Sequence, residues 1–381
     1  MLRSFVKSAI ACGLSHSGAA GLMRLSNGWR NVPLVLGYHR VVENFARESR
    51  QSIPAMLITS SMLEKHLDWL GQHYQFVSMP EACSRLKSGE PFPKPSALVT
   101  FDDGYQDFYQ NAMPLLSRKG IPAAVFVVTG LVGTSKLQIH DELYLRLSIA
   151  QSMWRNPAKE FAGFLSTLGI QIQARSDLQI LLSENRFTST GKLLDLLCQS
   201  DIHRIIEALK AAVPGSFPEK EGLCPLSWQM LKEIQKREFT IGSHTASHVL
   251  LTNESMPDAL RELKLSRLEL ETRLGDKVPY FAYPDGRFHR RIVRAVKASG
   301  FTFAFSTCTH RDPEYPLLTV PRKVLWEKSC INPFGSFDPA VMECQIMHLF
   351  DFMSPCTKNH YLPAATSEPK KAPAHVRHEH N

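Results

Sequence analysis

The sequence predicts an α/β fold, a distorted or incomplete (β/α) barrel (TIM-barrel-like) with an inserted helical subdomain and a disordered C-terminal tail. Two observations carry this prediction. Apolar runs of strand length recur along the chain and alternate with helical patterns, which is typical of parallel strands joined by crossover helices. The chain also has 381 residues, of which 44% are hydrophobic, and this is enough for the core of one barrel.

The predicted strands are apolar runs bounded by loop or turn signals. The first covers residues 33–38 and ends at His39, and the run 96–101 is followed by a turn at Gly104. The remaining predicted strands span 76–79, 123–128, 238–243, 278–283, 301–306 and 317–321.

Two helices have clear boundary signals. Ser61 to Glu64 has the form of a capping box and predicts a helix that runs to about His73. Leucines at helical spacing predict a second helix from about Pro257 to Leu274, with Gly275 as its stop.

The strand pattern divides the chain into three parts. Residues 31–330 form the predicted barrel domain, and between about 140 and 225 the strands give way to polar, helical sequence. We expect this insertion to cover the face of the barrel that carries the active site. Residues 331–381 are expected to be largely disordered, above all the segment 363–381, which has little to bury.

Residues 1–30 form the third part. They begin basic and become mildly apolar, which imitates a secretory signal, but Gly13 breaks the short apolar stretch and no A-x-A-like cleavage site is evident. We therefore expect an amphipathic helix that packs on the domain or makes a peripheral contact with a membrane surface. Export is the alternative.

Composition narrows the class of protein further. The net charge is +8, but Lys and Arg are spread along the chain and are not interleaved with aromatic residues, so no nucleic-acid partner is expected. No apolar run has the length of a membrane-spanning helix. The eight cysteines lack C-x-x-C spacing, which favours reduced thiols and a cytoplasmic protein, peripheral to the inner membrane if the N-terminal helix contacts it. The oligomeric state is left open.

Two adjacent carboxylates follow the predicted strand 96–101. Asp102 and Asp103 stand at the carboxyl end of a parallel strand, where α/β barrels and open α/β sheets place their chemistry. Successive strand residues point to opposite faces, and the turn at Gly104 can re-aim one side chain. One carboxylate can therefore bind a metal while the other handles a proton.

Two imidazoles follow the predicted strand 238–243. His244 and His248 have H-x-x-x-H spacing at a strand-to-loop junction, and Thr245 stands where a zinc protease motif carries Glu. The remaining set of two His and one Asp suits Zn²⁺ that holds a water, with Co²⁺, Ni²⁺, Mn²⁺ or Fe²⁺ as alternatives.

These residues resemble the polysaccharide deacetylases of carbohydrate esterase family 4, the NodB-homology family. Thr100 to Gly104 match the family's T-F-D-D-G motif, and His244 to His248 match its H-[ST]-x-x-[SH] motif. The resemblance covers about residues 31–325 and includes the segments 37–41, 122–127 and 281–286. It implies a metal-dependent hydrolase that removes N-acetyl or O-acetyl groups from an acetylated polysaccharide, oligosaccharide or glycolipid.

The resemblance also implies roles for individual residues. The expected metal ligands are Asp103, His244 and His248. Asp102 is expected to take the proton of the attacking water. The backbone N–H of Asp285 is expected to donate to the oxyanion, and Tyr283 and Tyr105 are expected to contact the substrate.

Two family features are missing from the chain. No L-x-x-x-H-D motif follows residue 300, so we expect His39, at the end of the first strand, to act as the general acid in a permuted strand order. Its alternative role is a hydrogen-bonding residue behind the site. The family's third motif carries Arg where this chain has Ala282, and Arg322 is expected to replace that Arg with a charge-assisted hydrogen bond to Asp102.

Two functions of other classes are kept as alternatives. A catalytically silent, carbohydrate-binding relative is disfavoured because both carboxylates and both imidazoles are retained. A non-haem iron oxygenase uses the same set of two His and one carboxylate, but its antiparallel scaffold is not predicted here.

Overall fold

A parallel β-sheet forms the centre of the computed structural model, which describes residues 2–16, 32–172, 186–212 and 221–351 together with Cys356 and His360. The strand order is β10-β1-β5-β6-β7-β8-β9, and the short strand β4 pairs with one end of β5. In chain order the strands are β1 (Leu34–Tyr38), β4 (Gln75–Phe76), β5 (Ser96–Phe101), β6 (Ala123–Val127), β7 (Thr240–Ser243), β8 (Tyr280–Ala282), β9 (Phe303–Phe305) and β10 (Lys323–Val324). Every pairing among them is parallel, as the alternating pattern predicts.

The two edges of this curled sheet are linked through one segment of chain. Val320 forms a parallel bridge with Phe305 of β9, and three residues later β10 pairs with β1. The sequence predicts one strand over 317–321, whereas residues 316–318 form a 3₁₀ turn and the pairing is divided between Val320 and β10. The result is the distorted, incomplete barrel that the sequence predicts, and its strand ends converge on one rim.

Close packing between β6 and β7 depends on a glycine. A Cβ placed on Gly242 would lie 2.5 Å from two ring carbons of Phe126, well inside van der Waals contact. Gly242→Ala is expected to destabilise the fold by about 1–3 kcal/mol, because the buried ring has to move. Urea denaturation measures this loss. As a control, Gly163→Ala has open space around the new methyl group and should instead stabilise by about 0.5–1 kcal/mol, so equal effects contradict the packing argument.

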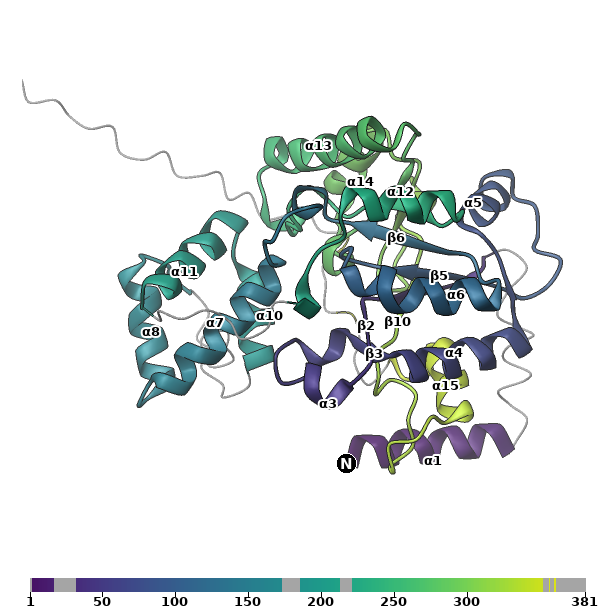
Figure 1. The fold of residues 1–381 in the computed structure, drawn as a ribbon, viewed down its shortest axis with the longest axis horizontal. Helices are drawn as coiled ribbons and strands as arrows, with labels where there is room; N and C mark the ends of the chain where they lie inside the picture. The colour runs from purple at the N-terminus through teal and green to yellow at the C-terminus, as the bar shows by residue number, and fades with distance from the viewer. Residues whose placement is uncertain are drawn as a thin grey trace, which may run out of the picture.

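Helices cover the sheet on its outer faces (Figure 1). They are α4 (Ser60–His73), α5 (Met79–Ser88), α6 (Met113–Lys119), α12 (Trp228–Lys236), α13 (Met256–Leu274) and α14 (Arg290–Ala298). The helix α13 ends at Gly275 with φ 78°, as the sequence predicts. A separate parallel pair, β2 (Arg40–Val42) with β3 (Leu57–Thr59), and the short helix α3 (Phe45–Glu48) lie beside the barrel.

The start of α4 differs from its prediction. The helix cap is Thr59, whose Oγ1 accepts from the N–H of Met62 at 3.1 Å, and Ser61 already lies inside the helix. Thr59 is held in place by Glu327, which accepts from its N–H at 2.8 Å and from its hydroxyl at 3.0 Å. This contact joins residues 268 positions apart, so the local capping-box pattern could not reveal it.

The predicted insertion is a helical lobe with a core of its own. Its helices are α7 (Ile139–Met153), α8 (Pro157–Thr167), α10 (Arg186–Leu196) and α11 (Gln199–Ala212). Buried side chains such as Leu147, Phe161 and Ile205 pack between these helices and not against the sheet. In Figure 1 the lobe lies to one side of the barrel, next to the ends of the strands.

The two ends of the described chain pack together. The helix α1 (Leu2–His16) lies against α15 (Pro339–Ile346), and Ala11 is buried with Val341, Cys344 and Phe350 (Figure 1). The expectation that disorder begins near residue 331 is therefore wrong for α15, because its apolar face has a partner that is more than 300 residues away in sequence. The expected disordered segment 363–381 and residues 17–30 lie outside the described residues. Among the described helices, none combines the length and the apolar character that a membrane span requires.

Candidate metal centre

Polar side chains gather where three strands of the sheet end. His39 follows β1, Asp102 and Asp103 follow β5, and His244 follows β7. Backbone pairing continues past the strand ends and fixes these positions, since the N–H of Asp102 donates to Tyr38 at 2.9 Å and that of His244 donates to Val127 at 2.9 Å. The side chains line a cavity of about 560 Å³, and residues of the helical lobe, including Phe187 and Asp195, line its other side.

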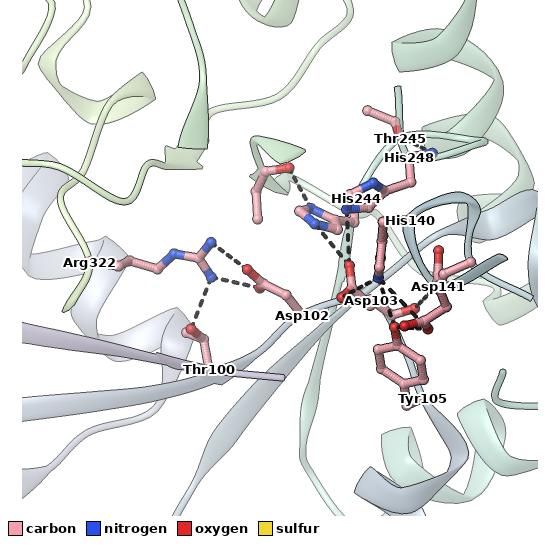
Figure 2. Close-up of polar contacts among 12 residues, drawn as sticks. Thr100, Asp102, Asp103, Tyr105, His140, Asp141, His244, Thr245, His248 and Arg322 are labelled. Carbon is pink, nitrogen blue, oxygen red and sulfur yellow. Dashed lines mark hydrogen bonds and ion pairs between the residues drawn. The ribbon is translucent and has the colours of Figure 1, made fainter. Parts of the chain in front are cut away.

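The carboxylate of Asp103 faces both imidazoles of the predicted triad (Figure 2). Its Oδ1 is 3.4 Å from Nε2 of His244 and 3.1 Å from Nε2 of His248. One ligand atom from each residue fits within 4.8 Å of the others. Asp103 and His248 both have positive φ, at 72° and 60°, a backbone strain that is common at functional sites.

Gly104 makes the turn that aims Asp103. Its φ is 70°, and a Cβ at this position would lie 2.9 Å from Cγ1 of Val127. Only glycine meets both demands, a left-handed backbone and close approach to β6. The glycine of the T-F-D-D-G motif therefore sets the direction of the Asp103 side chain, as the sequence predicts.

The hydrogen bonds of the triad fit a cation. Nδ1 of His244 lies 2.8 Å from the carbonyl oxygen of Ala282, which can only accept, so the neutral tautomer compatible with this contact has its proton on Nδ1 and its lone pair on Nε2. That lone pair faces Oδ1 of Asp103, and neither carboxylate oxygen accepts a hydrogen bond of normal geometry from the described residues. Two lone pairs held this close need a positive charge between them. The donor set of two imidazoles and one carboxylate therefore suits a divalent metal.

The charges of the triad are strongly coupled. Burial acts to raise the pKa of Asp103, but the neighbouring imidazoles, His248 first among them, outweigh burial and hold this pKa well below its usual range. Burial likewise acts to lower the pKa of His248, and the Asp103 carboxylate outweighs it, so this pKa is raised. Asp103 is thus ionised and can bind a metal ion.

Arg322 forms the contact with Asp102 that the sequence predicts. Its two terminal nitrogens donate to the two carboxylate oxygens of Asp102, each at 2.7 Å, and one of them also donates to Thr100 at 3.1 Å (Figure 2). Arg322 is only 1% exposed and Asp102 only 3% exposed. A buried, bidentate pair of this kind fixes the plane of the carboxylate.

Arg322 also sets the charge of Asp102. Burial acts to raise the pKa of this carboxyl group, but the positive charge of Arg322, with smaller contributions from His244 and His39, outweighs burial and lowers the pKa. Asp102 is therefore ionised at neutral pH, as a general base has to be.

His140 and Asp141 belong to the site, although the sequence did not single them out. They lie in the first turn of α7 and are buried, at 5% and 1% exposure. Nε2 of His140 is 3.9 Å from Oδ2 of Asp103, and its ring meets the ring of His248 edge-on at 4.8 Å. Burial lowers the pKa of His140 to about 3, so this imidazole is neutral and is no proton donor at neutral pH. The only sequence signal was their place at the start of the insertion.

Tyr105 is not a substrate contact, which corrects the sequence prediction. It is 1% exposed, and its hydroxyl donates to Asp141 at 2.6 Å and lies 2.9 Å from Nε2 of His140. The guanidinium of Arg40 lies 5.4 Å from the centre of its ring, and Arg40 is paired in turn with Asp107 at 2.9 Å. Tyr105 thus supports the triad from behind.

The expected contact of Tyr283 with the substrate is also wrong. It is fully buried, its ring packs edge-on against Phe281, and its hydroxyl donates to the carbonyl of Leu318 at 2.9 Å. A side chain enclosed in this way cannot pack against sugar, because alternation along the strand turns it into the core.

His39 and Asp285 do reach the cavity. Nδ1 of His39 is buried and accepts or donates no hydrogen bond within the described part of the chain. Asp285 lies in the tight turn Pro284–Gly286 with φ 52°, and its carbonyl accepts from the hydroxyl of Thr307 at 3.3 Å. Both residues therefore lie at the cavity, as the sequence predicts. In the strand order of the sheet, they lie on opposite sides of Asp102 and the triad.

Comparison with known proteins places the chain in a family. The model of the polysaccharide deacetylase family matches residues 89–157 and 187–304, on either side of a gap within the helical lobe. A poly-β-1,6-N-acetyl-D-glucosamine N-deacetylase of Staphylococcus aureus (strain MSSA476) is 36% identical over 111 residues, which are 27% of this chain and 38% of that protein. The enzyme of the same name from Staphylococcus epidermidis is 31% identical over 132 residues, 30% of this chain and 45% of its own length.

The chain therefore spans less than half the length of these curated relatives. The fold is similar to that of the Streptococcus pyogenes deacetylase PplD in complex with acetate, with a TM-score of 0.51, 17% identity, and coverage of 83% of this chain and 97% of that one. The segments that match the family model include both motifs, with Asp102, Asp103, His244 and His248. The chain belongs to the polysaccharide deacetylase family.

Proposed function

We propose that the protein is a metal-dependent hydrolase that removes N-acetyl groups from the sugars of a polysaccharide or oligosaccharide. The observation that carries the proposal is that the adjacent carboxylates have different partners. Asp103 faces two imidazoles, whereas Asp102 is paired with Arg322. A purely carbohydrate-binding relative has no use for an ionised, oriented carboxylate beside a metal site. The parallel barrel likewise offers no antiparallel scaffold for an iron oxygenase.

The residues that hold the metal in this proposal are Asp103, His244 and His248. Zn²⁺ fits their donor set best, and Co²⁺, Ni²⁺, Mn²⁺ and Fe²⁺ are compatible with it. A bound ion of this kind polarises a carbonyl and makes a water acidic near neutral pH. The carbonyl of Ala282 keeps His244 in the tautomer that such an ion needs.

Asp102 takes the proton of the attacking water. Its carboxylate is ionised and its plane is fixed by Arg322, so no reorientation is needed when the proton arrives. The backbone N–H of Asp285, at the turn Pro284–Gly286, supplies a hydrogen bond to the oxyanion that forms as the acetyl carbon becomes tetrahedral.

His39 protonates the leaving nitrogen. It lies in the same cavity as Asp102, and an amine is a poor leaving group unless it receives a proton. His39→Ala is therefore expected to lower the turnover of an N-acetylated oligosaccharide by about 10²-fold or more, and to affect an aryl acetate much less. Comparing kcat on the two substrates measures this difference.

Equal losses on the two substrates would assign His39 a structural role. The metal content of the variant serves as the control, because a role as general acid leaves the metal bound. His73→Ala, at the end of α4 where the half-buried His73 bonds the carbonyl of Trp69, is a matched histidine replacement away from the cavity.

The names of the relatives and the size of the cavity support this substrate class. Both curated relatives carry poly-β-1,6-N-acetyl-D-glucosamine in their names, and the cavity is large enough for a sugar unit and is open to neighbouring units. We therefore test acetate release across β-1,6-linked and β-1,4-linked N-acetylglucosamine oligomers, an O-acetylated glycan and a lipid-linked amino sugar. No release from any N-acetylated substrate by the zinc-loaded protein would overturn the proposed function.

A further inference from the structure

Four metal-ligating side chains meet at a second place, outside the catalytic cavity. They are Cys308, His310, Cys356 and His360, and one ligand atom of each lies within 4.8 Å of the others. Cys308 and His310 follow β9, whereas Cys356 and His360 come from the chain beyond α15. Two thiols and two imidazoles are the ligand set of a closed structural zinc site.

The distances within this cluster agree with that geometry. Sγ of Cys308 is 3.2 Å and Sγ of Cys356 is 3.4 Å from the same atom, Nε2 of His360. In a tetrahedral site with Zn–S near 2.3 Å and Zn–N near 2.0–2.1 Å, a sulfur and a nitrogen ligand are about 3.5 Å apart. Neither cysteine is in a disulfide. The ring of His310 completes the group, 4.9 Å from the ring of His360.

His360 is prepared for this role by the residues around it. It is only 2% exposed, its ring stacks on Phe288 at 4.1 Å, and its Nδ1 lies 2.9 Å from the carbonyl oxygen of Phe288. A carbonyl only accepts, so the proton sits on Nδ1 and the Nε2 lone pair points to the two sulfurs. An outer hydrogen bond of this kind is the usual support of a histidine that binds zinc.

We propose that Cys308, His310, Cys356 and His360 bind one structural Zn²⁺, which fastens the C-terminal segment to the barrel. Binding converts both thiols to thiolates and releases their two protons to solvent, so a neutral S₂N₂ site forms around the ion. The cluster lies next to functional parts of the chain. Thr307 precedes Cys308 and bonds the carbonyl of Asp285, and Phe288 follows the same turn. The zinc therefore stabilises the wall of the cavity that carries Asp285.

Cobalt substitution distinguishes this site from the metal-ligand triad of Asp103, His244 and His248, which contains no sulfur. The full chain loaded with Co²⁺ under reducing conditions is expected to show a thiolate-to-cobalt charge-transfer band in the near ultraviolet. Cys308→Ser and Cys356→Ser should each lower the band by about half or more, since each removes one of two thiolate ligands. The matched control Cys198→Ser, in the helical lobe, and the triad variant His244→Ala should both keep it.

A second measurement needs no substitution, in case the cysteine variants fold poorly. X-ray absorption at the zinc edge of the unmodified protein should show sulfur neighbours at about 2.3 Å. A spectrum explained by nitrogen and oxygen alone, a band that survives in Cys308→Ser/Cys356→Ser, or a disulfide between these cysteines under reducing conditions would overturn the proposal. Neither readout involves acetate release, so this site and the proposed function can fail separately.

Discussion

Replacing His244 with alanine is expected to cost the triad more than about tenfold in metal affinity and to abolish acetate release. The imidazole supplies one of three protein ligands, and the carbonyl of Ala282 orients it toward Asp103, so its removal leaves two ligands at the site. Calorimetric titration of zinc into metal-free protein measures the affinity.

The matched control is His203→Ala, an exposed histidine on α11 outside the cavity. It should leave both the affinity and acetate release unchanged. If the cysteine-containing cluster also binds zinc, the titration shows two transitions, and only the one assigned to the triad should vanish. Unchanged affinity in His244→Ala would disprove the triad.

Local sequence predicts the centre of the site well. The two aspartates and the two histidines follow two predicted strands, and the strand ends of a parallel sheet share one rim. Their convergence is therefore contained in the pattern of strands and motifs. Even Arg322 was predictable, because a buried carboxylate without its usual partner needs another cation near a neighbouring strand end.

What the sequence could not supply depends on packing across long separations. His140 reaches the triad only because the first turn of α7 is folded against Tyr105, and the direction of the Tyr105 side chain is set by Asp141 and Arg40. Tyr283 belongs to a motif next to the cavity, yet the alternation of a three-residue strand turns its ring into the core.

The cysteines show the same limit. Their spread along the chain without C-x-x-C spacing indicates only reduced thiols, whereas the fold brings Cys308 and Cys356 together with two histidines. The interval between the two cysteines includes β10 and α15, so no local sequence motif indicates the cluster. Only the return of the chain after α15 to the end of β9 creates it.

The two adjacent aspartates should separate cleanly by mutation, and this is the sharpest test of the proposed chemistry. Asp102→Asn is expected to leave the metal bound and to lower kcat by about 10²-fold or more, because the amide cannot accept the water proton. Asp103→Asn is expected to weaken metal binding instead, since it removes the carboxylate that faces both imidazoles. Metal content and acetate release are measured on the same samples.

Stability has to be followed alongside, because Asp102→Asn leaves the buried guanidinium of Arg322 without its counter-charge. Breaking a buried pair in this way costs about 3–5 kcal/mol, so the melting temperature of Asp102→Asn should fall. Asp102→Asn/Arg322→Gln removes both charges and should recover part of that stability while staying inactive, which separates the loss of the base from the loss of the fold. Equal loss of metal in the two single variants, with acetate release surviving in Asp102→Asn, would mean that the roles of Asp102 and Asp103 are not divided as the contacts of Arg322, His244 and His248 indicate.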